Sequence, residues 1–416
     1  MPIIFFLKNK IIFSFFIIFF LIFYRSPHIL IEGRFLAEEG NFFFRNSFLY
    51  GPVYGLFQVI PAGGYFELWT NIASVFATFV SLEYAPLVTV YFSLIVLFCI
   101  FVAILNFESE LFITDYQKYF ACLVILLSPP MTPEVWLTSL HSKSYFAILI
   151  FILLFQKDSP ICILKKKYSF FLLFISGLSS IYACVLWPIF LLKYLFFKTK
   201  KNFYNFVSIF FASCIQFVII FYFNYINIAK SNRFALEYDK IISFCYNILA
   251  KSFFGKEGTY YIITELNLFT SPVLVKLLIF IFISSFFFLA IKIKDKIFIL
   301  IILSFIWQSI FVIIGSMYSN FVGGRYGVVP GVFLIFLIFR IYQLQKNIFL
   351  KIFFSFFLAS SLIAGFYEYK YKTNLPKLLY CLNCPSWKEE VAKWKNDQNY
   401  HLRIWDYPNE RVKLTK

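Results

Sequence analysis

Long runs of apolar residues, separated by short charged or Pro- and Gly-containing segments, are the main feature of this chain. A helix needs about 20 apolar residues to cross the roughly 30 Å hydrocarbon core of a bilayer, so runs near that length predict membrane-spanning helices. The sequence therefore predicts an all-α polytopic membrane protein. The clearest candidate spans are residues 11–24, 86–106, 118–129, 144–156, 203–224, 272–291, 297–317, 329–344 and 349–367.

Three stretches need a decision about whether they cross. The first run is short enough to be a signal peptide, but it ends in Phe23–Pro27 without the small residues of a cleavage site, which indicates a retained anchor. Residues 66–82 mix apolar and polar side chains. Residues 168–192 contain a small, polar break around Gly177, followed by Trp187 and a proline.

The basic residues decide the direction of the spans. Cytoplasmic loops hold an excess of Lys and Arg. The basic connectors of this chain are residues 157–167, 193–201, 292–296 and 340–351, and the N-terminus is also basic.

These connectors all face the cytoplasm only if residues 168–192 return to the side they leave, as two short helices or as a re-entrant hairpin broken at Gly177. The number of crossings between these connectors also requires that residues 66–82 do not cross, so we expect them to lie along the outer surface as an interfacial helix. The connector at 107–118 then faces inward in spite of its acidic balance. We expect about eleven crossings, with a cytoplasmic N-terminus and an outer C-terminus.

Composition narrows the classes of function. The chain is 61% hydrophobic and only 14% charged, with a mean hydropathy of +0.78. These values exclude a soluble enzyme, because a soluble fold cannot hide so much apolar surface. The formal net charge of +17 lies mostly in the connectors assigned to the cytoplasm. We therefore interpret it as a topology signal, and we expect the lipid bilayer, not nucleic acid, as a partner.

The remaining polar residues gather on the outer side, where we expect the function to lie. Residues 1–367 form the predicted membrane domain, and residues 368–416 form an outer tail. The predicted outer segments of the membrane domain are the first outer loop 25–85, the second large outer loop 225–271, and two shorter segments, 130–143 and 318–328.

The first outer loop carries two adjacent carboxylates, Glu38 and Glu39, in an aromatic setting. Partial burial and like-charge repulsion raise the pKa of one member of such a pair, which suits a general base or a metal ligand. Two solvated loop glutamates are the alternative interpretation.

A second candidate site is the Gly-rich turn 322–330, which contains Arg325. Glycines let the backbone approach a ligand closely, and Arg is the preferred partner of phosphate oxygens. A snorkelling Arg at the lipid headgroups is the alternative. The outer segment 130–143 adds His141, which is either an interfacial residue or a catalytic one.

Apolar residues at helical spacing predict an outer amphipathic helix over residues 238–254. It either covers a lipid substrate or packs on the membrane surface. In the tail, Ser386 and Glu389 form a capping-box pattern, and Trp387, Val391 and Trp394 recur at helical spacing, which predicts one short helix packed on the outer mouth.

The cysteines carry no clear chemistry of their own. Six of the eight lie in or beside apolar segments and fit as small packing residues. Cys381 and Cys384 form a Cys-x-x-Cys pair without the second pair that a zinc site needs. A small disulfide and two free thiols both fit this pair.

Five short motifs, in order along most of the chain, resemble the GT-C superfamily of integral-membrane glycosyltransferases. They are most similar to an uncharacterised bacterial branch that has an Ala-Glu-acid-Gly motif in its first loop. This chain departs from the branch by having two Glu where the pair usually includes an Asp. The matching motifs are Ala37–Phe43, Pro61–Tyr65, Pro133–Trp136, Gly323–Tyr326 and Cys384–Trp387.

The resemblance implies a GT-C-like helical bundle that moves a sugar from a polyprenyl-phosphate donor to a surface glycan or lipid, outside the bacterial inner (cytoplasmic) membrane. It implies that Glu38, with Glu39 as the alternative, deprotonates the acceptor hydroxyl, and that Arg325 binds the leaving phosphate. No cofactor is expected. Two adjacent glutamates favour metal-independent action, although some superfamily members need a divalent cation. The other predicted binding residues are Tyr326, Arg45, Lys143, His141, Tyr65 and Arg233.

Two functions of other classes remain open: a transporter or flippase of lipid-linked sugars, and a non-catalytic subunit of an assembly complex. A transporter is expected to show inverted repeats and charges near the membrane midplane. No convincing repeat is present, and the interior polar residues, such as Gln216 and Gln308, are uncharged. The sequence also lacks a nucleotide-binding fingerprint, which fits a lipid-linked donor.

Overall fold

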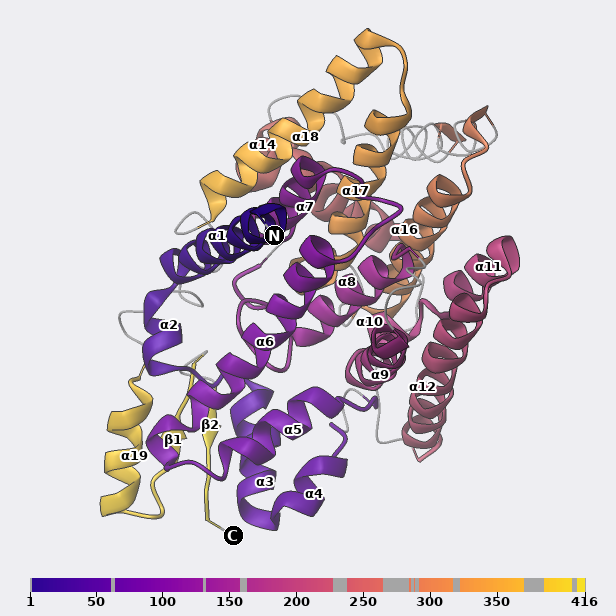
Figure 1. Ribbon diagram of the computed structural model, residues 1–416. Helices are drawn as coiled ribbons and strands as arrows, with labels where there is room; N and C mark the ends of the chain where they lie inside the picture. Colours follow the sequence, from indigo (N-terminus) through magenta and orange to yellow (C-terminus); the bar gives the residue numbers. More distant parts are fainter. Residues whose placement is uncertain are drawn as a thin grey trace.

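The computed structural model describes residues 2–60, 64–129, 132–157, 163–226, 238–264, 284–285, 288, 292–316, 322–369, 385–405 and 410–415. These residues are mostly helical, and their one sheet is a two-stranded antiparallel pair near the C-terminus (Figure 1). The chain is thus built as an all-α membrane protein, as the sequence predicts.

Within the described residues, five helices are long and apolar enough to cross a membrane. They match five predicted spans. They are α6 (Ala85–Asn106), α12 (Lys200–Tyr225), α16 (Lys296–Gly315), α17 (Val328–Leu344) and α18 (Ile348–Glu368).

Three further predicted spans are helical. They are α1 (Pro2–Arg25), α7 (Asp115–Leu127) and α8 (Ser142–Leu154). The helices α7 and α8 have 13 residues each, so each is only about 20 Å long. The ninth predicted span, 272–291, lies almost wholly outside the described residues.

The centre of the bundle is formed by α8 and α17. Every residue of α8 is buried, and Phe151 stacks on Phe333 of α17 with ring centroids 4.0 Å apart. A helix that is apolar on all sides is expected to lie inside a bundle, not at its lipid surface. The loops at either end of α8 are therefore anchored to a helix that is buried along its whole length.

The basic connectors come together with the 107–114 connector, at what we call the basic end (residues 107–114, 156–157, 193–201, 292–296 and 340–347). Hydrogen bonds and ion pairs join these segments although they lie up to 232 residues apart. The positive-inside rule predicts that the basic segments share one side of the membrane, and the contacts add the acidic 107–114 connector to them. The contacts are Lys193–Glu110 (2.7 Å), Lys201–Gln156 (2.9 Å), Arg340–Asp295 (2.6 Å) and Gln343–Leu111 (3.1 Å).

The stretch 168–192 forms short helices, α9 (Ile163–Ser179), α10 (Ile181–Cys184) and α11 (Trp187–Phe197). The predicted break into short helices is present, but it falls at Ser180 and not at Gly177, because α9 continues through Gly177 to Ser179. A Cβ at Gly177 would come within 2.6 Å of the Ala212 side chain, so the glycine permits close packing against α12. The chain breaks at Ser180, whose hydroxyl caps α10 by accepting from the Ala183 amide (3.1 Å).

The stretch 66–82 contains α5 (Leu68–Ala77), whose ten residues span only about 15 Å, half the thickness of the hydrocarbon core. Its polar side chains are buried against the protein, including Asn71 and Ser74, while Phe76 is exposed. An interfacial helix is expected to turn its polar face to water. In α5 that face instead binds neighbouring loops, as Asn71 does by donating to the Gln58 carbonyl (2.9 Å).

Short helices precede α5 in the first outer loop: α2 (Pro27–Glu32), a π-helix at Glu39–Phe44, α3 (Arg45–Tyr50) and α4 (Pro52–Phe57). A 3₁₀ turn, Leu82–Tyr84, then leads into α6. In Figure 1 these helices lie at the end of the molecule that also holds the C-terminus.

The tail contains α19 (Trp387–Asn396) and the strands β1 (Leu402–Arg403) and β2 (Arg411–Val412). The short helix agrees with the prediction, but Ser386 makes no side-chain cap to it. Trp387 donates to the Leu82 carbonyl (2.6 Å) and meets the ring of Phe35 edge-on at 5.0 Å. The tail is thus packed onto the first outer loop.

The second large outer loop contains α13 (Tyr238–Phe244), a π-helix at Cys245–Ala250 and α14 (Lys251–Thr264). The helical prediction over 238–254 agrees with these elements. Ser243 donates to the Val322 carbonyl (3.1 Å) and accepts from its amide (2.8 Å). The helix therefore packs on the segment that leads into a 3₁₀ turn, Gly324–Gly327.

Candidate functional site

The loop between α7 and α8 is the centre of the candidate site. We call it the central loop (residues 132–141). Three outer segments, each containing predicted site residues, bind this loop or the first turn of α8. They are the Glu38–Glu39 segment, the Tyr65–Thr70 segment and the Gly324–Gly327 turn. Because α8 is buried along its whole length, this loop is a fixed platform.

Glu39 is fully buried and holds the first outer loop to the central loop. One of its oxygens, Oε1, accepts from the backbone amide of Ser139 (2.7 Å) and from its hydroxyl (2.6 Å). Burial raises the pKa of this carboxyl, while the two Ser139 hydrogen bonds and the positive charge of Arg34 act in the opposite direction. Glu39 therefore has a structural role: its carboxyl, whose pKa is raised, holds the two loops together.

Glu38 has different surroundings. It is only partly buried, and among the described residues its carboxylate makes no hydrogen bond or ion pair. The preceding residue, Ala37, has a φ of 47°, a left-handed backbone conformation that turns the chain just before the pair. The two neighbouring glutamates thus differ in availability: Glu38 is open to a substrate and Glu39 is engaged.

A buried ion pair lies next to this segment. Lys143 Nζ binds Glu67 Oε1 at 2.7 Å and donates to the Tyr65 hydroxyl at 2.9 Å. Thr70 joins the pair to the central loop by donating to Glu67 (3.3 Å) and to the Ser139 carbonyl (3.1 Å). Both charged side chains are almost completely buried, so each depends on the other for compensation.

Arg325 reaches the central loop from the 3₁₀ turn before α17. Its guanidinium forms an ion pair with Glu134 and lies 3.3 Å from Nε2 of His141. Tyr326 lies beside it, with its ring centroid 5.4 Å from the Arg325 guanidinium carbon. Arg325 and Glu39 therefore bind residues of the same loop that are only two positions apart, His141 and Ser139.

His141 is buried and close to several cations. Burial, followed by the charges of Arg325, Lys143 and Arg34, lowers its pKa well below the ordinary value of 6.5. Its Nδ1 lies 3.1 Å from the Thr138 hydroxyl. The ring is therefore neutral at pH 7 and suited to hydrogen bonding, because a second positive charge beside Arg325 is unfavourable.

The remaining predicted residues do not join this cluster. Arg45 donates from Nε to the Lys413 carbonyl (2.9 Å), so it helps to hold the tail. Arg233, Cys381 and Cys384 lie outside the described residues. Across the described ranges, no group of three or more His, Cys, Asp or Glu side chains is placed to hold a metal ion.

Several residues of the site were not singled out from the sequence. Glu67 and Ser139 are recognised as site residues only in the structure, because their partners Lys143 and Glu39 lie 76 and 100 residues away in the sequence. Arg34 is the most buried cation near the glutamates, with 1% of its surface exposed. The only signal in the sequence for Arg34 was its position three residues before the motif that begins at Ala37.

Taken together, the cluster offers a free carboxylate, a neutral imidazole and several buried cations around one rigid loop. Such a set suits proton transfer from a hydroxyl and stabilisation of a negatively charged leaving group. Comparison with protein-family models, with curated proteins and with solved structures found no match.

Proposed function

We propose that this protein is a GT-C-type glycosyltransferase that moves a sugar from a polyprenyl-phosphate donor to a glycan or lipid acceptor on the outer side of the bacterial inner membrane. The observation that carries the proposal is the gathering of Glu38, Lys143 and Arg325 around the central loop, within hydrogen-bonded segments that are far apart in sequence.

In this proposal Glu38 is the general base. It accepts the proton of the acceptor hydroxyl, whose oxygen attacks the anomeric carbon with inversion as the polyprenyl phosphate departs with the bonding electrons. The free carboxylate of Glu38 supports this role more than Glu39, whose Oε1 already accepts two hydrogen bonds from Ser139. Cationic side chains, with Arg325 as the predicted ligand, neutralise the phosphate.

The proposed topology has about eleven crossings, a cytoplasmic N-terminus and an outer C-terminus. It puts the basic end in the cytoplasm and the central loop outside. The contacts that join the 107–114 connector to Lys193 and Gln343 support this orientation, because they group that connector with the basic ones. Reporter fusions after Asn347 and after Phe79 should show opposite sides of the membrane.

Transfer of a labelled sugar from a polyprenyl-phosphate donor, measured in membranes that contain the protein, tests the proposed chemistry. Removal of a general base costs about 10²- to 10⁴-fold in rate, so we expect Glu38→Gln to lower transfer by that factor. Glu32→Gln is the matched control, since Glu32 is an exposed carboxylate in the same loop.

Full transfer by Glu38→Gln would rule out the carboxylate mechanism. If the wild-type protein moves intact lipid-linked sugar across vesicle membranes but transfers none to an acceptor, the protein is a transporter. If it does neither in the presence of a donor and acceptor, the assembly-subunit interpretation replaces the enzyme.

A further inference from the structure

Arg25, the last residue of α1, is a buried cation that forms no ion pair with any residue in the described part of the chain. Only 4% of its surface is exposed, and its guanidinium carbon lies 4.3 Å from the ring centroid of Trp136 and 4.7 Å from that of Tyr369. Its Nε and Nη1 atoms are buried and have no hydrogen-bond partner, and it forms no salt bridge with any residue that the structure describes. Two aromatic faces hold the charge in place but leave its N–H groups unused.

Arg34 repeats this arrangement in the first outer loop. Its Nη2 donates to the carbonyls of Pro133 (3.3 Å) and Trp136 (2.6 Å), while its Nε and Nη1 are buried and unpartnered. Burial lowers the pKa of Arg34 to about 10, with Glu39 raising it and Arg25 lowering it further. Both arginines contact Trp136, Arg25 through its ring and Arg34 through its carbonyl. Buried donors without partners are rare in folded proteins and call for an explanation.

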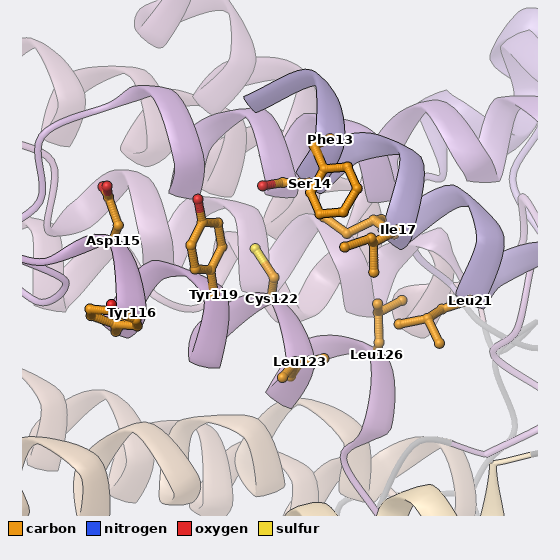
Figure 2. A pocket seen from close by; sticks show the side chains of 11 residues that line it. Phe13, Ser14, Ile17, Leu21, Asp115, Tyr116, Tyr119, Cys122, Leu123 and Leu126 are labelled. Atoms are coloured by element: carbon orange, nitrogen blue, oxygen red, sulfur yellow. The ribbon is translucent and has the colours of Figure 1, made fainter. Parts of the chain in front are cut away.

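An apolar groove of about 450 Å³ runs between α1 and α7 (Figure 2). Figure 2 shows Phe13, Ile17 and Leu21 of α1 on one side and Cys122 and Leu126 of α7 on the other. Its length along α1, from residue 13 to residue 21, corresponds to about 12 Å. A groove of this kind in a membrane helix pair suits a hydrocarbon chain.

The groove ends at Leu21, and neither arginine lines it, but Arg25 continues the same face of α1 beyond that end. Ile17, Leu21 and Arg25 follow one another at intervals of four residues, so they lie on the same face of α1. Arg25 is one turn, about 6 Å, beyond the end of the groove at Leu21. Tyr369 joins the two parts, since its hydroxyl donates to the Leu21 carbonyl (2.9 Å) and its ring lies against Arg25.

We propose that the groove and the two arginines form one binding site for a lipid phosphate, with the chain between α1 and α7 and the phosphate on the unused N–H groups of Arg25 and Arg34. Guanidinium groups bind phosphate oxygens with strong, charge-assisted hydrogen bonds. The adjoining apolar groove selects a phosphate carried on a hydrocarbon chain over free phosphate. The site deepens the proposed function, on which the identity of the ligand as a polyprenyl phosphate rests.

Arg325 differs from these two residues because Glu134 already balances its charge. Among the described residues, Arg25 and Arg34 form no such ion pair. Glu39, whose charge acts on Arg34, is hydrogen-bonded to Ser139. A phosphate placed here lies beside the segment that carries both glutamates. Arg25 and Arg34 are therefore the main phosphate ligands in this proposal.

Ligand-induced thermal stabilisation of the purified full-length protein in a maltoside detergent tests the site. The probes are farnesyl phosphate, farnesol and inorganic phosphate at equal concentration. We expect farnesyl phosphate to raise the melting temperature most, and inorganic phosphate to have no effect. Loss of two charged hydrogen-bonding groups should weaken farnesyl phosphate binding by about 10- to 100-fold in the Arg25→Gln/Arg34→Gln double variant. The matched control is Arg411→Gln, which removes an exposed arginine at the same end of the molecule.

A second pair of variants tests the groove without touching the arginines. Ile17→Trp fills the groove from its exposed side and should abolish stabilisation by farnesyl phosphate and by farnesol. Phe16→Trp changes the neighbouring exposed residue, which does not line the groove, and should keep both effects.

Unchanged farnesyl phosphate binding in the double arginine variant, or in Ile17→Trp, would overturn the proposal. Equal stabilisation by inorganic phosphate would overturn it as well, because it would show an anion site without a lipid chain. Glu38→Gln should bind farnesyl phosphate normally while losing sugar transfer. Failure of the lipid site and failure of the proposed chemistry are thus measured separately.

Discussion

The two ends of the helical bundle handle charge in different ways. At the basic end, ion pairs such as Lys193–Glu110 and Arg340–Asp295 include a carboxylate that keeps about a fifth of its surface exposed, 23% for Glu110 and 19% for Asp295. At the opposite end, the Lys143–Glu67 pair is almost completely buried, and Arg25 and Arg34 form no salt bridge with any described residue.

We interpret the charges at the basic end as a topology signal, and the buried charges at the opposite end as parts of the candidate site. Partly exposed pairs contribute little to stability, and an excess of Lys and Arg in such loops is typical of the cytoplasmic side, where the proposed topology puts them. Buried cations with unused N–H groups reduce stability unless a ligand binds them. Proteins keep such groups where they are needed for function, and here the charge of Arg34 acts on Glu39.

The largest expected effect comes from breaking the buried pair. Lys143→Met leaves Glu67 as an uncompensated buried carboxylate, so we expect a loss of about 3–5 kcal/mol in the free energy of unfolding. Denaturation of the purified protein in detergent measures this loss. The double variant Lys143→Met/Glu67→Gln should regain much of it, since no buried charge is left; a double variant as unstable as the single one would contradict this explanation.

Acidification should affect the central loop before the tail. The folded-state pKa of His141 is lowered, so below pH 6.5 the unfolded chain binds the proton more strongly and stability falls with falling pH. The slope reaches at most about 1.4 kcal/mol per pH unit for one group. Melting curves between pH 7.5 and 5 should show this slope in the wild type and a smaller one in His141→Gln.

The carboxylate Glu390 in the tail provides the contrast. Hydrogen bonds from Arg403, Lys393 and Tyr400 outweigh its burial and lower its pKa to about 2. Its stabilising effect is therefore lost only as the pH falls from about 4.5 towards 2. If Glu390→Gln changed the slope between pH 7.5 and 5, the assignment of that slope to the central loop would be wrong.

A smaller effect is expected at the basic end. Lys193→Met leaves Glu110 with 23% of its side chain exposed to water, so the loss should be about 1 kcal/mol. The same denaturation measurement applies. A loss as large as that of Lys143→Met would remove the distinction between the two ends.

The smallest effect concerns the tail helix. Substitution of an N-cap Ser by Ala costs about 1 kcal/mol when its hydroxyl caps the helix. Ser386 makes no such hydrogen bond, so Ser386→Ala should leave the melting temperature unchanged within error. A clear decrease would show that the capping box predicted from Ser386 and Glu389 does form.

Local patterns explain most of the correct predictions about the fold. Five predicted spans correspond to long apolar helices, because the length of an apolar run and the cost of exposing backbone in lipid act on each segment separately. The short tail helix and the helix over 238–254 follow from apolar spacing in the same way. The break at Gly177 was misplaced because a glycine that ends one helix looks the same in sequence as one that lets two helices pack closely.

The sequence alone determined that this chain belongs in a membrane, which connectors carry the basic excess, and that Glu38, Glu39 and Arg325 are unusual among its outer residues. Tertiary structure decided how those residues are used: Glu39 became a clamp on Ser139, Glu38 stayed free, and Arg325 acquired Glu134 as a partner. The hydrophobicity of a membrane span depends only on the residues of that segment, so it can be predicted from the local sequence. The partner of a buried charge depends on which distant loops the packed helices bring together, and no local pattern encodes that.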